Sequence, residues 1–306
     1  MGAERLWAIV GATGTGKTSL SLDLAEELIR SGRPAEIVNA DAMQLYRGMD
    51  IGTAKIPVPE RRGIPHHLFD EFDVTEDVAV AVYQERARAT IRDIFDRGAD
   101  AILVGGSGLY VSSVVFDFRF PPRDSALRAR LEADLDELGA SALIERIRAV
   151  DPGAAERLDP RNGRRVVRAL EVLLQGADTH GAALPEAPVL WHPATELVGV
   201  HLDRAELVLR LDERVRGMWR GGLLAEVDAL RAGGLESGPT APRAIGYAQA
   251  LAQLAGRMDE EEAVAETQAL TRRYARRQVS WFKRYPGLRW VDAGTPGIRL
   301  LDHLTS

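Results

Sequence analysis

The residues with the clearest chemistry lie near the N-terminus, where the sequence reads GATGTGKT. Two glycines and the closing Lys-Thr pair have the spacing of a phosphate-binding loop, G-x-x-x-x-G-K-[ST]. In such a loop, backbone N–H groups at a helix start point at phosphate oxygens, the lysine contacts the outer phosphates, and the hydroxyl group binds Mg²⁺. The loop predicts a diphosphate or triphosphate site but does not say whether the ligand is a nucleotide. The predicted phosphate-binding residues are Gly11, Ala12, Thr13, Gly14, Thr15, Gly16, Lys17 and Thr18, with Thr18 as the metal ligand.

A carboxylate is predicted to share this site. Proteins that hydrolyse nucleotides usually carry an aspartate after a second apolar strand, but here the best apolar run, AILV, ends in the glycine-rich turn 105–108. Asp41 instead follows another expected strand, EIVN. Ligands of open parallel sheets gather at the carboxyl ends of the strands, which places Asp41 beside the loop. The spacing alone does not distinguish two roles for Asp41, which could be a metal ligand or a general base.

Alternating strand and helix patterns must position these residues. We expect strands at 7–10, 37–39, 101–104 and 197–202, and helices at 18–30, 78–97, 203–218, 223–232, 243–254 and 259–283. Residues 47–65 are rich in Gly and Pro and indicate a loop. This alternation is typical of βαβ units and a parallel sheet.

The middle of the chain has a different character. Residues 124–175 are rich in Leu, Ala, Arg and Glu at helical spacing, and they lie between the boundary segments FRFPPRDS (118–125) and GADTHGAALPEAP (176–188). The predicted fold class is α/β: a P-loop NTPase-like parallel sheet flanked by helices, with an inserted all-helical domain. Residues 1–120 and 195–306 would form the catalytic core, and residues 121–194 the helical insertion.

Composition limits the functional classes. The chain has 306 residues, a net charge of −6, no cysteine and no apolar run long enough to span a membrane. The absence of cysteine excludes disulfides and thiolate zinc sites and agrees with a cytoplasmic protein. The negative total conceals a basic segment at 267–291, which has seven Lys or Arg and no acidic residue. We expect a monomer that does not bind membranes.

Seven motifs, in order along nearly the whole chain, resemble those of bacterial tRNA dimethylallyltransferases. They are GATGTGKT (11–18), NADAMQLYRGMDIGTAK (39–55), GIPHHLFD (63–70), LVGGSGLY (103–110), RRVVRALEV (164–172), PRAIGYAQ (242–249) and TRRYARRQVSWFKR (271–284). The resemblance implies transfer of a dimethylallyl group from dimethylallyl diphosphate to the exocyclic amine of the adenine 3′ of a tRNA anticodon. Diphosphate would be released, with Mg²⁺ as the cofactor.

The resemblance also implies roles for individual residues. Lys17, Thr18 with Mg²⁺, and the loop amides would stabilise the leaving diphosphate, and Asp41 would orient the amine and accept its proton. Arg214 would add a cation at the diphosphate. The alternative for Arg214 is a helix-surface arginine paired with Asp212 or Glu213.

The resemblance further implies a set of RNA contacts. The helical insertion would grip the anticodon stem, and the adenine would leave its stack to reach Asp41. Trp281 and Phe282, at helical spacing, are more typical of core packing than of base stacking. The adjacent His66 and His67 favour a structural role over metal binding. The residues at RNA-contact positions are Asp41, Ala42, Met43, Gln44, Ser107, Arg128, Arg164, Arg165, Arg168, Arg243, Gly246 and Tyr247.

Departures and alternatives stay open. Ala42 stands where the family usually has serine, which removes one hydroxyl contact, and Ala248 stands where Lys or Arg is common. An adenylate isopentenyltransferase that uses free AMP would share the loop and Asp41 but would need no helical insertion. An ATP-driven RNA-binding protein would share the loop, although the missing acid after AILV is unfavourable to it.

Overall fold

The computed structural model describes residues 4–117, 120, 124–176 and 188–301. The chain divides into two compact units, Met1–Phe116 with Val189–Ser306, and Asp117–Pro188. The predicted boundary segments 118–125 and 176–188 lie largely outside the described residues. The first unit resumes at Val189, not at the predicted 195, because the Trp191 N–H donates to the Val115 carbonyl (2.8 Å) and Leu190 bridges Phe116.

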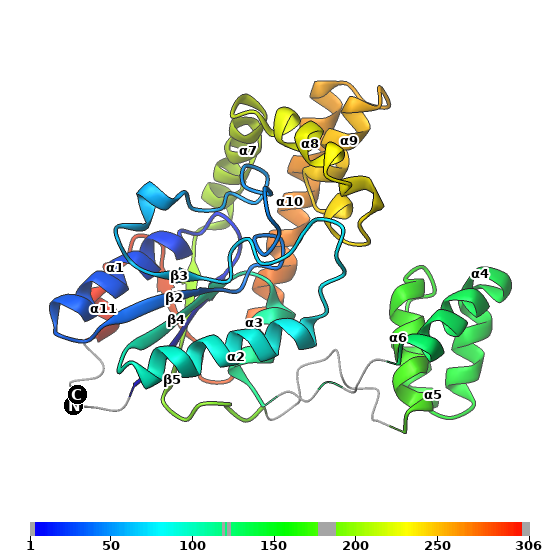
Figure 1. The fold of residues 1–306 in the computed structure, drawn as a ribbon, viewed down its shortest axis with the longest axis horizontal. Helices are drawn as coiled ribbons and strands as arrows, with labels where there is room; N and C mark the ends of the chain where they lie inside the picture. The colour runs from blue at the N-terminus through cyan, green and yellow to red at the C-terminus, as the bar shows by residue number, and fades with distance from the viewer. Residues whose placement is uncertain (1–3, 118–119, 121–123, 177–187, 302–306) are drawn as a thin grey trace. The chain divides into compact units, whose positions relative to one another are not determined.

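The core of the first unit is a parallel sheet (Figure 1). Its strand order is β3-β2-β4-β1-β5-β6, and each neighbouring pair is parallel. Because Val10 pairs with Gly105 and Val104 pairs with Asn39, the carboxyl ends of the three central strands lie at one edge of the sheet. The strands are β1 (Leu6–Gly11), β2 (Ala35–Asn39), β3 (His66–His67), β4 (Asp100–Gly105), β5 (Thr195–His201) and β6 (Arg289–Asp292).

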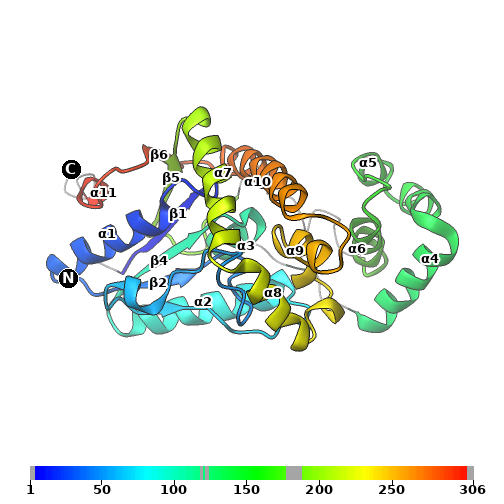
Figure 2. The ribbon, with the colours of Figure 1, turned by 90° about the horizontal axis from the view of Figure 1, so that it is seen from above.

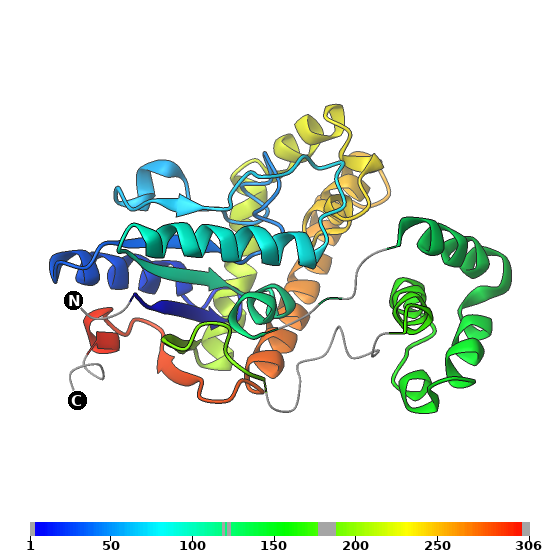
Figure 3. The ribbon, with the colours of Figure 1, turned by 60° about the horizontal axis from the view of Figure 1, so that its bottom comes forward.

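Helices cover both faces of the sheet. On one face α1 (Lys17–Arg30) and α11 (Ile298–Leu301) pack over a cluster that includes Trp7 and Ile9. Helices α2 (Val80–Asp96) and α3 (Gly108–Val115) lie on the other face, where α2 runs along the sheet (Figure 3). This arrangement buries every residue of β1 and leaves the carboxyl edge as the open side of the sheet.

Four helices rise beyond that edge (Figure 2). Helix α10 packs against α7, α9, β1 and α3, and so connects the sheet to the helical layer. These helices are α7 (Arg204–Arg220), α8 (Leu223–Ala232), α9 (Tyr247–Leu254) and α10 (Glu260–Phe282), and short 3₁₀ turns occupy Val58–Arg61, Leu235–Ser237 and Ala241–Arg243.

The second unit is helical, as α4 (Ser125–Arg148), α5 (Pro152–Glu156) and α6 (Gly163–Leu174) show in green in Figure 3. Gly139, at φ 78°, interrupts α4, so its two halves pack on α6 around Leu131, Leu143 and Val167. Across the described residues, none of the helices has the length and apolarity needed to cross a membrane.

The predicted strands and helices are confirmed, with shifts at their ends. The helix predicted over 243–254 begins only at Tyr247, because Gly246 takes φ +93° and turns the chain first. Helix α3, strand β6 and helix α11 were not predicted. The fold class, an α/β parallel sheet with a helical insertion, is confirmed.

Gly105 offers a test of the strand spacing at the carboxyl edge. A Cβ at this position would lie 2.2 Å from the Ala40 carbonyl oxygen, so Gly105→Ala must push β4 away from β2. We expect a loss of about 3 kcal/mol in the free energy of unfolding, measured by urea denaturation. Gly217→Ala is the control, since nothing lies within 4 Å of its Cβ in α7, and it should stabilise by about 0.5 kcal/mol. Equal unfolding midpoints would contradict this packing.

Candidate active site

The phosphate-binding loop connects β1 to α1 and depends on backbone that only glycine supplies easily. Gly11 has φ +146°, and a Cβ there would lie 2.7 Å from the Val200 carbonyl oxygen. Gly16, at φ +92°, comes directly before α1. The first N–H groups of a helix have no partner within it, so the start of this 14-residue helix presents donors and a positive dipole end to an anion.

Lys17 lies at the first turn of α1. Its Nζ donates to the Ala12 carbonyl oxygen at 2.7 Å, which folds the side chain back over the loop. Burial lowers the pKa of Lys17 to about 8, while nearby Asp41 raises it and nearby Arg214 lowers it. The ammonium group therefore lacks full solvation and would gain from a bound anion.

Asp41 is held just beyond the end of β2. The side chain of Asn39, 2 % exposed, accepts from the Asp41 N–H (2.9 Å) and donates to the Asp41 carbonyl (3.2 Å). The Asp41 carboxylate accepts from the Met43 N–H at 3.0 Å. These bonds fix the orientation of the carboxylate, and its Oδ1 is the oxygen that accepts from Met43.

Arg214 lies on α7, and its side chain is near Asp41. The alternative pairing with its helix neighbours is wrong, because Asp212 binds Arg272 and Glu213 binds Arg220. The Arg214 Nη2 donates instead to the Thr53 carbonyl oxygen at 3.5 Å. Burial lowers the pKa of Arg214 and nearby Asp41 raises it, so this cation is also poorly solvated.

A cavity of about 320 Å³ opens beside these groups. Its lining brings together the phosphate-binding loop, the segment after β2, the turn after β4, and helices α7 and α10. The predicted site residues that line it are Thr13, Asp41, Ala42, Met43, Ser107, Arg214, Arg243 and Tyr247.

Other predicted residues lie outside this lining, among them every residue of the phosphate-binding loop except Thr13. The Gln44 amide donates to the Thr53 carbonyl (3.1 Å), and Gly246 turns the chain into α9. The four predicted RNA-contact arginines outside the lining belong to the helical unit and differ in exposure. Arg164 and Arg165 are exposed, whereas Arg128 and Arg168 are partly buried, with guanidinium nitrogens 3.6 and 2.9 Å from the fully buried Glu171 carboxylate.

Known proteins resemble this chain over nearly its whole length. The family model described as IPP transferase matches residues 44–285. A tRNA dimethylallyltransferase of Clavibacter sepedonicus is 59% identical over 297 residues, which cover 97% of this chain and 95% of the relative. The chain belongs to the IPP transferase family.

Solved structures agree with this family membership. The tRNA isopentenylpyrophosphate transferase of Bacillus halodurans has a TM-score of 0.70 and 35% identity, covering 99% of this chain and 96% of that one. A eukaryotic dimethylallyltransferase acting on tRNA has a TM-score of 0.79 and 26% identity, and the match covers 98% of this chain and 76% of that one.

In this IPP transferase family member, sequence reasoning missed Gln278 of α10. Its Oε1 accepts from the Thr13 N–H (2.8 Å) and its Nε2 donates to the Gly106 carbonyl (2.9 Å), so one buried amide joins the phosphate-binding loop to the turn after β4. The Thr13 amide, expected to point at phosphate, donates to Gln278 instead. The only sequence signal for Gln278 is its polar side chain at a position that helical spacing places on the buried face of α10.

Aromatic residues of α10 divide between the cavity and the core. Tyr274 lines the cavity, and burial raises its pKa to about 12, with Asp41 adding to the rise and hydrogen bonds to Ser107 and Gln278 opposing it. Core packing is confirmed for Phe282, which is fully buried. Trp281 is partly exposed, and its Nε1 donates to Ser112 Oγ at 3.1 Å.

The two histidines have structural partners. His66 Nδ1 lies 2.7 Å from the Ile64 carbonyl oxygen, and His67 Nε2 lies 2.6 Å from the Glu36 carboxylate. Among the residues described, no group of three or more His, Cys, Asp and Glu side chains is arranged to hold a metal.

Proposed function

We propose that the protein transfers the dimethylallyl group of dimethylallyl diphosphate to the exocyclic amine of the adenine 3′-adjacent to a tRNA anticodon. The observation that carries this proposal is a pair of partly buried cations, Lys17 and Arg214, near Asp41, which is the one carboxylate among the described residues that line the 320 Å³ cavity. This local excess of positive charge suits a diphosphate, and the carboxylate suits an amine that must lose a proton.

The residues divide the reaction between the leaving diphosphate and the attacking amine. As the new C–N bond forms, the C–O bond to the diphosphate breaks, and negative charge grows on the leaving oxygens. Lys17, Arg214 and the amides at the start of α1 stabilise that charge. The Asp41 carboxylate accepts the proton that the amine loses, and diphosphate is the released product.

Mg²⁺ fits the donor set of the loop. The Thr18 side chain is exposed at the start of α1, next to Lys17, and a hydroxyl oxygen is a ligand of the hard type that Mg²⁺ prefers. Mg²⁺ usually keeps several waters and shares substrate phosphates, so Thr18 with a bound diphosphate meets its needs. When bound, the ion would neutralise charge on the leaving diphosphate.

Transfer RNA is the proposed acceptor. The names of its relatives refer to tRNA, and the relative from Clavibacter sepedonicus matches 97% of this chain. The helical unit supports this choice, because an enzyme for free AMP needs no such addition. Exposed Arg164 and Arg165 at the start of α6 supply charges for RNA phosphates.

The deciding experiment incubates the protein with dimethylallyl diphosphate, Mg²⁺ and unmodified tRNA, and then measures the mass of the adenosine next to the anticodon. We expect one added five-carbon group. AMP in place of tRNA tests the small-molecule alternative, and phosphate release from ATP with RNA tests the ATP-driven one. Preference for AMP, or RNA-stimulated ATP hydrolysis without transfer, would contradict the proposal.

Arg165 tests the role of the helical unit. If its guanidinium contacts an RNA phosphate, Arg165→Ala should weaken tRNA binding and reduce the slope of log affinity against log salt by about 1. Arg161→Ala is the control, because Arg161 already binds Asp159 at 2.9 Å. Filter binding between low and moderate salt measures both. An unchanged slope for Arg165→Ala would argue against this contact.

A further inference from the structure

The segment 50–55, from the motif GMDIGTAK, has no part in the reaction as proposed so far, yet it forms a wall of the cavity. Gly52 and Thr53 line the cavity directly. The Thr53 carbonyl oxygen accepts from Gln44 (3.1 Å) and from Arg214 (3.5 Å), so it connects a predicted RNA contact to a predicted diphosphate contact. The position of this one carbonyl therefore affects both ends of the site.

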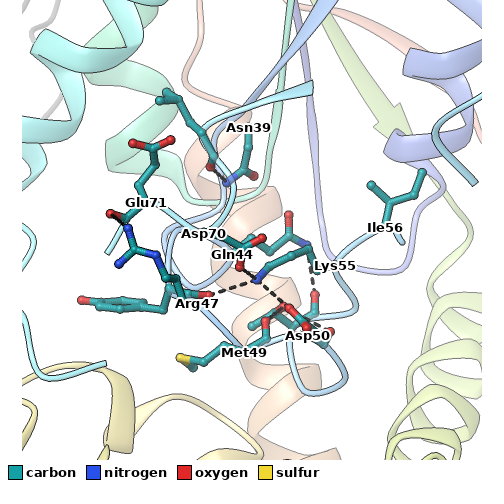
Figure 4. Close-up of polar contacts among 12 residues, drawn as sticks. Asn39, Gln44, Arg47, Met49, Asp50, Lys55, Ile56, Asp70 and Glu71 are labelled. Atoms are coloured by element: carbon teal, nitrogen blue, oxygen red, sulfur yellow. Dashed lines mark hydrogen bonds and ion pairs between the residues drawn. The ribbon is translucent and has the colours of Figure 1, made fainter. Parts of the chain in front are cut away.

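Lys55 fixes one end of the segment, as Figure 4 shows. Its side chain is only 4 % exposed, and its Nζ donates to Asp50 Oδ1 (2.7 Å), Asp70 Oδ1 (2.6 Å) and the Tyr46 carbonyl (3.0 Å). The three donors of the ammonium group thus match three oxygens. Asp70 reaches this place from a left-handed backbone conformation, φ +59°.

The choice of lysine here is informative. Lysine occurs in this sequence only at positions 17, 55 and 283, while Lys and Arg together number 39. A compact ammonium group suits three oxygens that converge on one point, whereas a planar guanidinium group does not. Most basic residues of this chain are arginines, so the lysine at position 55 indicates that a compact ammonium group is needed there.

Glu226 of α8 fixes the other end of the segment. Its carboxylate accepts from the N–H groups of Asp50 (3.2 Å), Ile51 (2.7 Å) and Gly52 (3.3 Å), three successive amides that form an anion-binding nest. The Tyr247 hydroxyl donates to the same carboxylate at 2.5 Å.

The Tyr247 ring also requires glycine at position 52. A Cβ on Gly52 would lie 2.4 Å from a ring carbon of Tyr247, so the backbone and the ring are in close contact. Glu226 therefore joins two walls of the cavity, one from the segment 50–55 and one from α9.

We propose that Lys55 and Glu226 are positioning residues, which hold the segment 50–55 so that the Thr53 carbonyl keeps Arg214 and Gln44 in place. This inference rests on the proposed transfer reaction. Neither residue would contact a substrate. Their effect would be on the rate of transfer, because a misplacement of about 1 Å at a reacting group costs on the order of 100-fold.

The first test compares Lys55→Met and Glu226→Gln with Arg47→Met. Arg47 lies on the same loop, but its exposed guanidinium binds Asp73 and the Glu71 carbonyl, both of which lie outside the segment 50–55. We expect the first two variants to lose about 100-fold in the single-turnover rate, and Arg47→Met less than about twofold. Lys55→Arg should not restore the rate. Melting temperature is recorded for every variant, and a folded Lys55→Met with the wild-type rate overturns the proposal.

The second test asks whether Glu226 acts through Arg214. If it does, Glu226→Gln should cost about 100-fold in the wild-type background but about threefold or less in an Arg214→Ala background. Equal losses in the two backgrounds overturn this route.

Hydrogen exchange separates this inference from the proposed function. The amides of Ile51 and Gly52 should exchange faster in Glu226→Gln, while amides of β1 keep their protection. Unchanged exchange at these two amides contradicts the positioning role. A wild-type protein that transfers no dimethylallyl group contradicts the proposed function instead.

Discussion

Replacement of Asp41 with asparagine is expected to lower the rate of dimethylallyl transfer about a thousandfold, because a general base contributes about 10²–10⁴. Asparagine has nearly the same shape, and its Oδ1 can still accept from the Met43 N–H, the bond that holds the carboxylate at 3.0 Å. The Asn39 amide continues to hold the backbone at this position. What the variant lacks is an acceptor for the proton of the adenine amine.

The measurement is a single-turnover assay with saturating tRNA and dimethylallyl diphosphate, together with direct donor binding. Donor binding should survive, since Lys17, Arg214 and the start of α1 are unchanged. Asp73→Asn is the matched control, because Asp73 is exposed and its carboxylate pairs with the exposed guanidinium of Arg47. Turnover of Asp41→Asn within about fivefold of wild type would remove Asp41 as the base.

The pattern of the sequence was sufficient for most of the fold. Strands β1 and β4 contain the continuous apolar runs LWAIV and AILV, as expected for strands covered on both faces, and β2 and β5 contain the shorter runs IV and LVGV. Helices α1, α2, α7, α8 and α10 have apolar residues at helical spacing. Helix α3 was missed because GLYVSSVV is short and rich in β-branched residues, which favour strands in isolation. Its helical form depends on packing against α2 and β4, which local pattern does not contain.

The site was less accessible to sequence reasoning than the fold. Asp41 and the loop were found from spacing, because the carboxyl edge of a parallel sheet collects residues from separate segments. Arg214 needed the family resemblance, since a helix arginine beside two acids reads as a surface pair. Gln278 and Glu226 make contacts with residues that are far away in the sequence. Gln278 binds Gly106 across a separation of 172 residues, and Glu226 binds Ile51 across 175. No local pattern records such pairs.

Replacement of Lys17 with methionine is expected to lower the transfer rate about a thousandfold and to weaken donor binding. Methionine keeps most of the length of the side chain but removes the cation. The loss of one preorganised donor to a developing anion costs about 10²–10³ in rate, and here a full charge is lost as well. Lys17→Arg should not restore activity, because a planar guanidinium group does not fit the place where Nζ contacts the Ala12 carbonyl at 2.7 Å.

The expected size of this effect follows from the environment of Lys17. Burial has already lowered its pKa to about 8, so the protein holds a cation that is poorly solvated before the donor binds. Arg214, which is partly buried, adds positive charge to the same region, and Asp41 offsets only part of it. A diphosphate relieves this imbalance, and the relief is greatest when the leaving oxygens carry most charge. Arg30→Met, at the exposed far end of α1, keeps the helix and should change the rate less than about twofold. Equal rates for Lys17→Met and Arg30→Met would show that the loop does not hold the leaving group.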